Sequence, residues 1–466
     1  MVFKEKGAPA PFFLKMIIKT NKHEYLLIKE LGLLVNPEIK DEFNRIIPEK
    51  LTNEKINQLI EGLKKEKSDE EIDAELCNVS NLVFGITENC NLRCSYCGYS
   101  GIYFGERTHS QKKITFGTAQ KAIDLFFKYI GMDCRTLNRK IITIGFYGGE
   151  PLLEIELIGK IIDYARKRSL ELGLQEIFQF DYLISTNGLL LRDDIVDFLV
   201  AKDASVAVSI DGPRETHDKF RVMVNKKGSW QVIMDNLRRF KNRYPEFFKK
   251  NVTFLCVLHP LYDGKAIDDF FLSNQQYFDL PKITFLSLKM DSLKESLETA
   301  IREEAATKKY PISRLFYKYN IANRFKKNDF KINILTPTSK LTGNCFPGGK
   351  KFLVGANGDI HVCESINQNF PIGNVFEGIN YNNIRYMVLA FNEGIIKEKC
   401  WECAVWFLCN TCFVPSTYGK EFRFFCPKKD IVTGLENFLN YREDEYEKSQ
   451  SCIAIDSVRD YLEFLQ

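Results

Sequence analysis

Short apolar runs and longer amphipathic stretches alternate along the middle of the chain. Six runs rich in Val, Ile, Phe and Tyr have the length of buried strands. They are residues 81–87, 140–148, 180–187, 204–211, 251–258 and 282–289. Between them, apolar residues recur at three- and four-residue spacing, which is typical of helices that bury one face. These stretches are residues 118–130, 155–173, 193–202, 229–244 and 264–278. Six strand–helix units in series predict an α/β fold with a parallel sheet, as an open sheet or a partial TIM-type (β/α)6 barrel.

The first 80 residues show a different pattern. FFLKMIIKT, HEYLLIKE and LGLLVN indicate three short strands, while NPEIKDEFNRII and LTNEKINQLIEGLKKEKS indicate helices. We therefore expect a small α+β domain ahead of the barrel. The acidic stretch DEEIDAE, residues 69–75, is most simply a solvated linker.

The first four predicted strands end in residues with special chemistry. The segments that follow or close them contain Cys90, Gly148-Gly149-Glu150, Ser185 to Gly188, and Ser209 to Gly212. Ligand sites of parallel α/β folds lie at the carboxyl ends of the strands. Glycines let a ligand approach the backbone, and the polar side chains suit an ammonium group and ribose hydroxyls. Those side chains belong to Glu150, Ser185, Asn187, Ser209 and Asp211. Asn-Gly and Asp-Gly are also common turns, but four such ends in a row favour a binding site.

Composition and charge exclude several classes of protein. The chain has 466 residues, 45% of them apolar, which is enough for a large core and several domains. The net charge of +4 is too small for a nucleic-acid footprint. The apolar stretch near the N-terminus is about half as long as a membrane helix. We expect a soluble cytoplasmic protein that binds neither nucleic acid nor membrane.

Fourteen cysteines are many for such a protein, and most of them occur in groups. The first group is Cys90, Cys94 and Cys97. The second is Cys400, Cys403, Cys409, Cys412 and Cys426, with Cys345 and Cys363 upstream of it. Cys77, Cys134, Cys256 and Cys452 are isolated, as small buried apolar residues often are. A reducing cytosol favours metal ligands over disulfides for the grouped thiols.

The first cysteine group carries a family resemblance. Cx3Cx2C after the first strand, followed by Gly-Gly-Glu-Pro after the second, resembles the radical S-adenosylmethionine (SAM) superfamily over about residues 80 to 290. The resemblance implies a partial (β/α)6 barrel. It also implies a 4Fe-4S cluster on Cys90, Cys94 and Cys97, whose fourth iron is left for SAM. The alternative is a zinc site completed by His109.

The same resemblance implies roles for the residues at the strand ends. Tyr96 would lie against the adenine, and Gly148, Gly149 and Glu150 would contact the methionine amine. The ribose or carboxylate of SAM would be held by residues from the next strand ends and beyond. These are Ser185, Asn187, Ser209, Asp211 and Arg221. The reduced cluster would cleave SAM to a 5′-deoxyadenosyl radical, and the protein would supply positioning and exclusion of water.

The C-terminal cysteines resemble the SPASM extension, which implies two auxiliary clusters. By that pattern one cluster is enclosed by four thiols, and the other has three. The first set is Cys400, Cys403, Cys409 and Cys426, and the second set is Cys345, Cys363 and Cys412. A further cysteine usually follows Cys345, and its absence predicts an open iron unless Cys452 or another residue, such as His361, closes it. A zinc ribbon on Cys400, Cys403, Cys409 and Cys412 is the alternative.

These resemblances divide the chain into four parts. Residues 1–80 look like a peptide-recognition element, which binds a leader peptide as an added strand, although a cap without a binding role fits as well. Residues 81–290 form the radical SAM core, residues 291–340 a helical linker, and residues 341–466 the SPASM domain.

The stretch YSGIYFGERTHSQKKITFGTAQKAID, residues 99–124, looks like maturases of cysteine-rich ribosomal peptides. That resemblance implies an oxidoreductase that installs thioether crosslinks from a Cys sulfur to a carbon of a precursor peptide. Its partners would be the precursor with its leader and an electron donor such as flavodoxin or ferredoxin. The rival enzyme is an anaerobic sulfatase maturase that makes formylglycine, with Glu364 as its catalytic base. The rival of another class is a non-catalytic iron–sulfur electron carrier.

Overall fold

A computed structural model describes most of the chain between residues 53 and 433. Its described residues are 15–19, 24–28, 33–35, 53–103, 107–132, 141–288, 293–308, 313–316, 345–403, 409, 411–433 and 436. Cys134, Cys452 and the helix expected over NPEIKDEFNRII lie outside the described residues.

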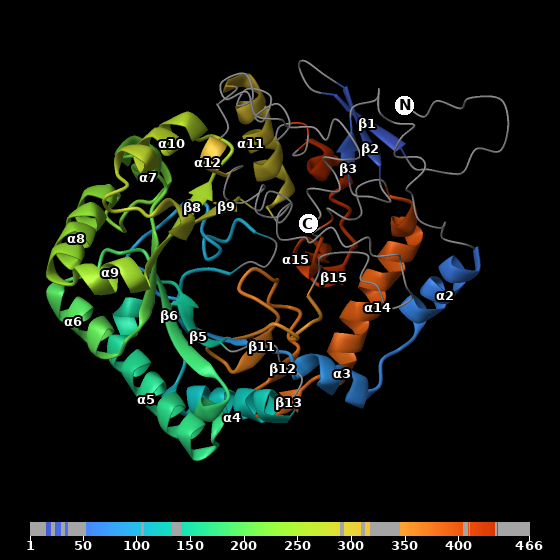
Figure 1. Ribbon diagram of the computed structural model, residues 1–466, viewed down its shortest axis with the longest axis horizontal. Helices are drawn as coiled ribbons and strands as arrows, with labels where there is room; N and C mark the ends of the chain where they lie inside the picture. The colour runs from blue at the N-terminus through green and yellow to red at the C-terminus, as the bar shows by residue number, and fades with distance from the viewer. Residues whose placement is uncertain are drawn as a thin grey trace, which may run out of the picture.

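A continuous sheet organises the molecule (Figure 1). Its six neighbouring parallel strands follow each other in chain order, which confirms the predicted α/β barrel-type fold. They are β4 (Asn81–Thr87), β5 (Ile141–Gly148), β6 (Gln179–Thr186), β7 (Ser205–Ser209), β8 (Val252–Leu258) and β9 (Ile283–Ser287). Each predicted strand lies within two residues of an observed one at both ends.

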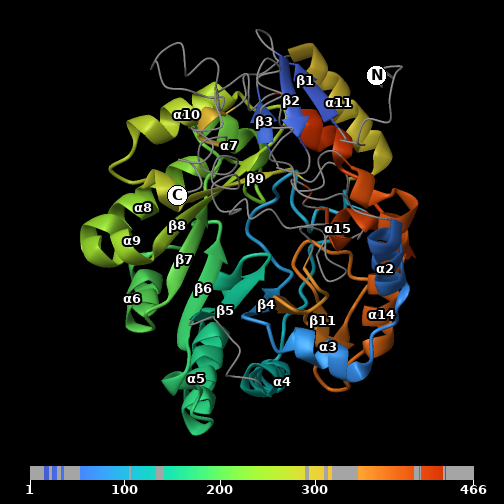
Figure 2. The ribbon, with the colours of Figure 1, turned by 45° about the vertical axis from the view of Figure 1, so that its right-hand side comes forward.

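Helices cover the outer face of this sheet in both views (Figure 1 and Figure 2). The expected ones are α4 (Phe116–Met132), α5 (Ile155–Glu171), α6 (Asp193–Ala201), α8 (Trp230–Arg243) and α10 (Gly264–Ser273). Helix α10 ends five residues earlier than its apolar pattern predicts. Asn274 ends it, because its Nδ2 donates to the Phe270 carbonyl and its backbone leaves the helical region. Two short helices that periodicity did not reveal are α7 (Arg214–Phe220) and α9 (Pro245–Asn251).

The core lies between the sheet and these helices. Along β4, Leu82, Phe84 and Ile86 are fully buried, whereas Val83 and Gly85 between them are only half-buried and lie on the opposite face of the strand. The outer face therefore packs under helices, and the inner face is left to line the inside of the barrel.

Four further strands extend the sheet beyond β4. Strand β10 (Lys351–Val354) runs parallel to β4, and three short antiparallel strands follow it. These are β11 (Asp359–His361), β12 (Gly373–Asn374) and β13 (Gly378–Ile379). The C-terminal region is thus joined to the barrel by main-chain hydrogen bonds.

The remaining elements lie outside the ten-stranded sheet. The N-terminal strands form an antiparallel sheet, as expected, and helix α2 packs on the long helix α14. The bounds are β1 (Lys15–Lys19), β2 (Glu24–Ile28), β3 (Leu33–Val35), α2 (Asn53–Lys64), α14 (Tyr381–Lys397), α15 (Phe413–Ser416), β14 (Thr417–Tyr418) and β15 (Glu421–Phe422). The expected helical linker is described only at α11 (Glu295–Lys308) and α12 (Arg314–Phe316). No helix among the described residues combines the length and the apolar character needed to cross a bilayer.

The acidic stretch 69–75 is a helix, so its interpretation as a solvated linker is wrong. Helix α3 (Asp69–Leu76) begins at a capping box, in which Glu71 N donates to Ser68 Oγ at 3.2 Å and Ser68 N to Glu71 Oε2 at 2.9 Å. Ile72 and Leu76 are completely buried. Asp69 and Glu70 are exposed, while two apolar residues anchor the helix.

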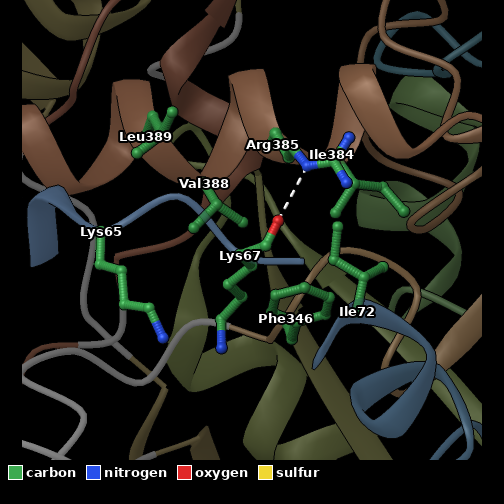
Figure 3. A pocket seen from close by; sticks show the side chains of 8 residues that line it. All are labelled: Lys65, Lys67, Ile72, Phe346, Ile384, Arg385, Val388 and Leu389. Atoms are coloured by element: carbon green, nitrogen blue, oxygen red, sulfur yellow. Dashed lines mark hydrogen bonds between the residues drawn. The ribbon is translucent and has the colours of Figure 1, made fainter. Parts of the chain in front are cut away.

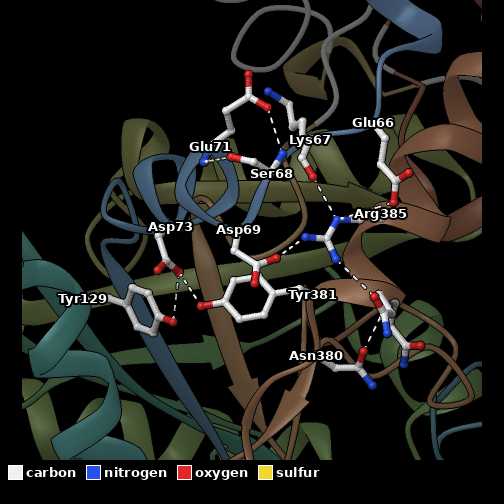
Figure 4. A network of polar contacts seen from close by, with 12 residues as sticks. Glu66, Lys67, Ser68, Asp69, Glu71, Asp73, Tyr129, Asn380, Tyr381 and Arg385 are labelled. Atoms are coloured by element: carbon white, nitrogen blue, oxygen red, sulfur yellow. Dashed lines mark hydrogen bonds and ion pairs between the residues drawn. The ribbon is translucent and has the colours of Figure 1, made fainter.

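Polar contacts fix α3 between the barrel and the C-terminal region (Figure 4). Asp73 Oδ1 accepts from the hydroxyl of Tyr129 on α4 at 3.2 Å and from that of Tyr381 on α14 at 2.8 Å. Arg385 on α14 donates to the Lys67 carbonyl at 2.8 Å and pairs with Asp69.

Apolar contacts continue this packing toward the cysteines. Phe346 lies beside Ile72 of α3 and Ile384 and Val388 of α14, and the Lys67 ammonium is 5.8 Å from its ring centre (Figure 3). Phe346 directly follows Cys345, so α3 supports the loop that begins at this cysteine.

Candidate active site

The loop after β4 carries the first cysteine group and is held on two sides. On one side, Gly149 N donates to Thr87 O at 2.7 Å and Glu150 N to Asn89 O at 2.9 Å. On the other side, main-chain bonds join Arg93 to Val222 and Ser95 to Phe220, at the end of α7. The predicted meeting of strand ends therefore exists, and it brings this loop against the Gly-Gly-Glu segment.

Cys90, Cys94 and Cys97 lie close together in surroundings that disfavour their thiolates. Burial raises the pKa of the Cys90 thiol to about 11 and that of Cys94 to about 12, and it also raises the pKa of Cys97. Charge on Cys97 would also raise the pKa of Cys90 and of Cys94, and charge on Cys90 would raise that of Cys94, as expected of neighbouring thiols. A bound cation would remove this cost, because metal coordination deprotonates a thiol.

Donors already point at two of the sulfurs. Leu92 N donates to Cys90 Sγ at 3.3 Å, Asn187 Nδ2 approaches the same sulfur at 3.7 Å, and Tyr99 N donates to Cys97 Sγ at 3.4 Å. Hydrogen bonds to sulfur stabilise thiolate ligands of iron–sulfur clusters. The donor set fits the 4Fe-4S cluster that the resemblance implies.

Gly148 and Gly149 allow the β5 end to approach the cysteine loop. Gly148 has φ of 133°, and a Cβ atom there would lie 2.4 Å from Thr87 O. A Cβ atom on Gly149 would lie 2.1 Å from Asn89 O. Both contacts are with backbone, so no larger residue fits without moving the loop.

Glu150 is fully buried at the junction of two strand ends. Its carboxylate accepts from Thr186 Oγ1 and Asn187 N, both at 2.8 Å, and from Leu152 N at 3.1 Å. Burial nevertheless raises the pKa of this carboxyl. A ligand ammonium beside it would stabilise the carboxylate, as the predicted amine contact requires.

Tyr96, Asp211 and Arg221 form a buried network on the opposite wall. The Tyr96 hydroxyl donates to Asp211 Oδ2 and accepts from Arg221 Nη1 at 2.9 Å. Asp211 also accepts from Val257 N at 2.9 Å, and burial raises the pKa of its carboxyl. Within the described part of the chain, Arg221 Nε is buried without a hydrogen-bond partner. An acceptor on a ligand would satisfy it.

Ser185 and Ser209 complete the predicted strand-end residues. They are half-buried on β6 and β7, two residues before Asn187 and Asp211 respectively. Their contacts with SAM stay predictions.

An aromatic wall at the β8 end was missed in the sequence. Phe220 stacks on His259 with ring centres 4.4 Å apart, and Tyr262 lies 5.1 Å from Phe220. Tyr96 is 6.3 Å from Phe220 and 6.5 Å from His259. The sequence does carry a signal for it, because His259 directly follows the fifth predicted strand, where a ligand site of this fold class is expected.

Four of the C-terminal cysteines lie near one another. Burial raises the pKa of the Cys400 thiol to about 12, and nearby charge on Cys409, Cys426 and Cys403 would raise it further. The pKa of Cys409 is raised in the same way, and Cys403 and Cys426 contribute. These are the four thiols that the SPASM resemblance assigned to one cluster.

The second set of C-terminal cysteines is spread over separate elements. Cys345 is exposed, while Cys363 and Cys412 are half-buried against the main apolar core. Cys412 is the N-cap residue of α15. Their grouping around a second auxiliary cluster stays a prediction.

Two residues near Cys363 bear on the rival functions. The Glu364 carboxylate pairs with Lys351 Nζ at 2.7 Å, so its charge is partly compensated. His361 is 3% exposed, and its Nδ1 has no hydrogen-bond partner among the described residues.

The described residues give no support to the zinc site with His109. His109 Nδ1 lies 3.2 Å from Glu88 O, and its ring stacks on Tyr99 with centres 5.9 Å apart. In the described ranges no three Cys, His, Asp or Glu side chains converge on one metal position. A cluster with several irons binds each cysteine at a separate iron, so its ligands stand further apart.

Comparisons with known proteins agree with this geometry. Residues 84–271 match the radical SAM superfamily. A cysteine-type anaerobic sulfatase-maturating enzyme of Clostridium novyi is 28% identical over 225 residues, which are 43% of this chain and 57% of that protein. The subtilosin biosynthesis protein AlbA of Bacillus subtilis is 21% identical over 76% of this chain and 70% of its own length.

A solved structure shows the same fold. Native anSMEcpe with bound AdoMet superposes with a TM-score of 0.51 at 18% identity, over 78% of this chain and all of that one. The chain spans about half the length of the clostridial maturase in sequence, and AlbA is matched more fully at lower identity.

Proposed function

Because this chain carries a radical SAM domain over residues 84–271, we propose that it is a peptide-modifying radical SAM enzyme. We further propose that it joins a Cys sulfur to a carbon of a ribosomally made precursor peptide as a thioether. The observation that carries the proposal is the presence of two clusters of cysteines in one fold. Three cysteines lie in the loop after β4, and four others, Cys400 among them, lie near one another in the C-terminal region.

The strand-end residues would bind the cofactors. Cys90, Cys94 and Cys97 would hold a 4Fe-4S cluster, and Glu150 would bind the amine of SAM. Tyr96 would lie against the adenine, with Asp211 and Arg221 fixing its hydroxyl. Gly148, Gly149, Ser185, Asn187 and Ser209 would complete the SAM site. When bound, this cluster and SAM supply a 5′-deoxyadenosyl radical. The buried walls would exclude water from it.

Thioether formation needs an electron acceptor as well as a radical. Per ring, the substrate loses one hydrogen atom from carbon to the 5′-deoxyadenosyl group and one proton from the thiol. One electron is left when the C–S bond closes. An auxiliary cluster on Cys345, Cys363 and Cys412 would accept it, and the second auxiliary cluster on Cys400, Cys403, Cys409 and Cys426 would pass it on.

The partners follow from the same reaction. Among the described strands, β1 and β3 are the edges of the sheet β1–β2–β3, and a leader peptide would add to one of them as a further strand. An external donor such as flavodoxin or ferredoxin would reduce the clusters. We place the reaction in the cytoplasm, whose thiols stay reduced. We also propose that the chain is divided into four parts, residues 1–80, 81–290, 291–340 and 341–466.

A formylglycine-forming maturase is the second candidate, and the relative from Clostridium novyi favours it. That reaction needs a base at the Cys or Ser substrate, for which Glu364 is the candidate. The ion pair with Lys351 stabilises the charged carboxylate and so makes it a weaker base. This contact favours the thioether reaction.

The test is mass spectrometry of a synthetic Cys-rich peptide incubated anaerobically with the reconstituted chain, SAM and dithionite. We expect loss of two hydrogens per ring and resistance of that Cys to iodoacetamide. Replacement of a Cys sulfur by a carbonyl would identify the formylglycine reaction instead.

The variant Cys345→Ala separates SAM cleavage from crosslinking of the peptide. It should keep SAM cleavage and lose crosslinking, because the first thiol set is intact. Full crosslinking by this variant would rule out a role for the Cys345 cluster.

A further inference from the structure

One guanidinium group connects the two cysteine-rich parts of the protein. Arg107 Nη2 donates to the carbonyl oxygen of Glu364 at 2.5 Å, and Arg107 Cζ lies 4.9 Å from the centre of the Tyr99 ring. Tyr99 follows Cys97 by two residues, and Glu364 directly follows Cys363. Residues separated by 257 positions in the chain are thereby joined.

From these contacts we propose that Arg107 is a positioning residue. It holds the Cys363–Glu364 segment in place relative to the Cys97 loop, so that each cleavage of SAM leads to modification of the peptide. We call this dependence coupling. The coupling part of this inference rests on the proposed function, whereas the positioning part stands on the contacts themselves.

Arg107 and its acceptor Glu364 are both anchored by further contacts. Gly101 N donates to Arg107 O at 2.9 Å, and Ser100 and Thr108 form an antiparallel bridge beside it. On the other side, Lys351 pairs with the Glu364 carboxylate, and Lys351 begins the strand that hydrogen-bonds to β4. The contact therefore transmits position between two fixed segments.

The site requires a flat cation. A Cβ atom on Gly98 would lie 3.3 Å from Arg107 Nη2, so the guanidinium fits closely over the backbone next to Cys97. The guanidinium lies over the face of the Tyr99 ring and at the same time donates a hydrogen bond to the Glu364 carbonyl. A lysine ammonium can donate to the carbonyl but cannot stack in this way.

The surroundings place this group at the inner wall of the barrel. Burial raises the pKa of Tyr147, the penultimate residue of β5. Arg107 opposes the rise, while Tyr99, Cys97 and Glu364 add to it. These groups therefore lie near enough to the Tyr147 hydroxyl to act on it, and half-buried Tyr147 lies on the face of β5 opposite to the buried Phe146, which is the inner face.

Small displacements of the Cys363–Glu364 segment should strongly reduce the amount of peptide modified per SAM cleaved. A misplacement of about 1 Å commonly costs on the order of 100-fold in rate, because reacting groups lose their alignment. SAM cleavage depends on the strand-end residues and should persist when Arg107 is replaced.

The first experiment measures positioning without relying on activity. Hydrogen exchange of the reconstituted full-length chain is compared for wild type and Arg107→Gln. We expect exchange of the amides in residues 359–366 to rise about 10-fold or more, since the segment loses a tether, and exchange in residues 141–148 to stay unchanged. Unchanged exchange in residues 359–366 would overturn the proposal.

A double-mutant cycle tests the stacked geometry. Tyr99→Leu should raise exchange in residues 359–366, and adding Arg107→Gln should raise it little more, because both changes break one contact. Arg107→Lys should restore part of the protection. Additive effects of the two single changes would contradict the stacked bridge.

The second experiment measures coupling with the Cys-rich peptide, SAM and dithionite. For Arg107→Gln we expect the ratio of 5′-deoxyadenosine to crosslinked peptide to rise 10-fold or more, with SAM cleavage within about twofold of wild type. Arg192→Gln, at an exposed surface pair, is the control and should match wild type. A parallel fall in SAM cleavage and crosslinking, with loss of iron, would show that Arg107 only maintains the fold. If wild type forms no crosslink, the proposed function fails, and hydrogen exchange still decides the role of Arg107.

Discussion

At the scale of single residues, chemistry concentrated in short motifs could be predicted and contacts across the chain could not. Cys90, Gly149 and Glu150 were found because parallel strands bring their carboxyl ends to one edge of a sheet. Arg107 and His259 were missed, because their partners are distant in sequence and no local pattern marks them.

Gly149 provides a sharp test of the strand-end geometry. In Gly149→Ala, a Cβ atom 2.1 Å from Asn89 O would force the cysteine loop away from β5. Such overpacking costs about 1–3 kcal/mol, so SAM affinity should fall by roughly 10- to 100-fold. Equilibrium dialysis of the reconstituted protein measures the affinity.

Gly117→Ala is the matched control for that change. Its added Cβ atom would meet nothing nearer than Thr115 Oγ1 at 3.9 Å, so affinity should stay at the wild-type value. Equal affinities of both variants would show that the Gly149 backbone contact does not shape the SAM site.

His259 gives the site a pH dependence of stability. Burial lowers its pKa to about 4, Lys219 lowers it further and Glu304 opposes the shift. The unfolded state binds a proton near pH 6.5 and the folded state does not, so stability falls as the pH drops from about 6.5 toward 4. Between pH 7 and pH 5, His259 should account for about 2 kcal/mol of lost stability.

Urea denaturation of the full-length chain at both pH values measures this loss. His259→Gln removes the titrating ring. The variant should therefore lose about 2 kcal/mol less free energy of unfolding than wild type between pH 7 and pH 5. Identical pH profiles for variant and wild type would mean that His259 titrates normally in the folded protein. The comparison is needed because the raised pKa values of Glu150 and Asp211 act in the opposite direction.

At the scale of elements, strong periodicity predicted the strands and helices of the barrel well. Apart from the 17-residue helix α14, which was not predicted, the elements that escaped prediction were short or locally encoded. Strands β11 to β13 have two or three residues each, too few to show a period. Helix α3 is encoded by a capping box at Ser68 and Glu71, a signal that the acidic composition of the stretch obscured.

Arg385 tests the docking of α3. In Arg385→Ala, the Lys67 carbonyl loses its donor at a partly buried position and the exposed Asp69 loses its ion-pair partner, and we expect a loss of about 1–3 kcal/mol in the free energy of unfolding. Exchange of the amides in residues 65–76 should also rise. Urea denaturation and hydrogen exchange measure the two effects.

Arg243→Ala supplies the comparison. Arg243 pairs with Asp197 at 2.7 Å, but both side chains are more than two-fifths exposed, so its loss should cost less than about 1 kcal/mol. If both variants lost the same stability, the α3 contacts would be no stronger than an ordinary surface pair.

At the scale of the whole molecule, the sheet joins parts that the sequence presents in series. The barrel strands and β10 to β13 form one ten-stranded sheet, and α3 bonds to both α4 and α14. The connections from the barrel and α3 to the C-terminal region could not be predicted, because they join residues 269 and 308 positions apart in the chain. One connected scaffold thus carries both clusters of cysteines. This arrangement suits the proposed reaction, which uses both.

The measurement that tests this account most directly is 5′-deoxyadenosine formation by the anaerobically reconstituted chain with SAM and dithionite. Wild type and a control with the isolated buried cysteine changed, Cys256→Ala, should both produce 5′-deoxyadenosine. The triple variant Cys90→Ala, Cys94→Ala, Cys97→Ala should produce none and bind about four fewer irons. Formation of 5′-deoxyadenosine by the triple variant, or its absence with wild type, would contradict the assignment of the strand-end site.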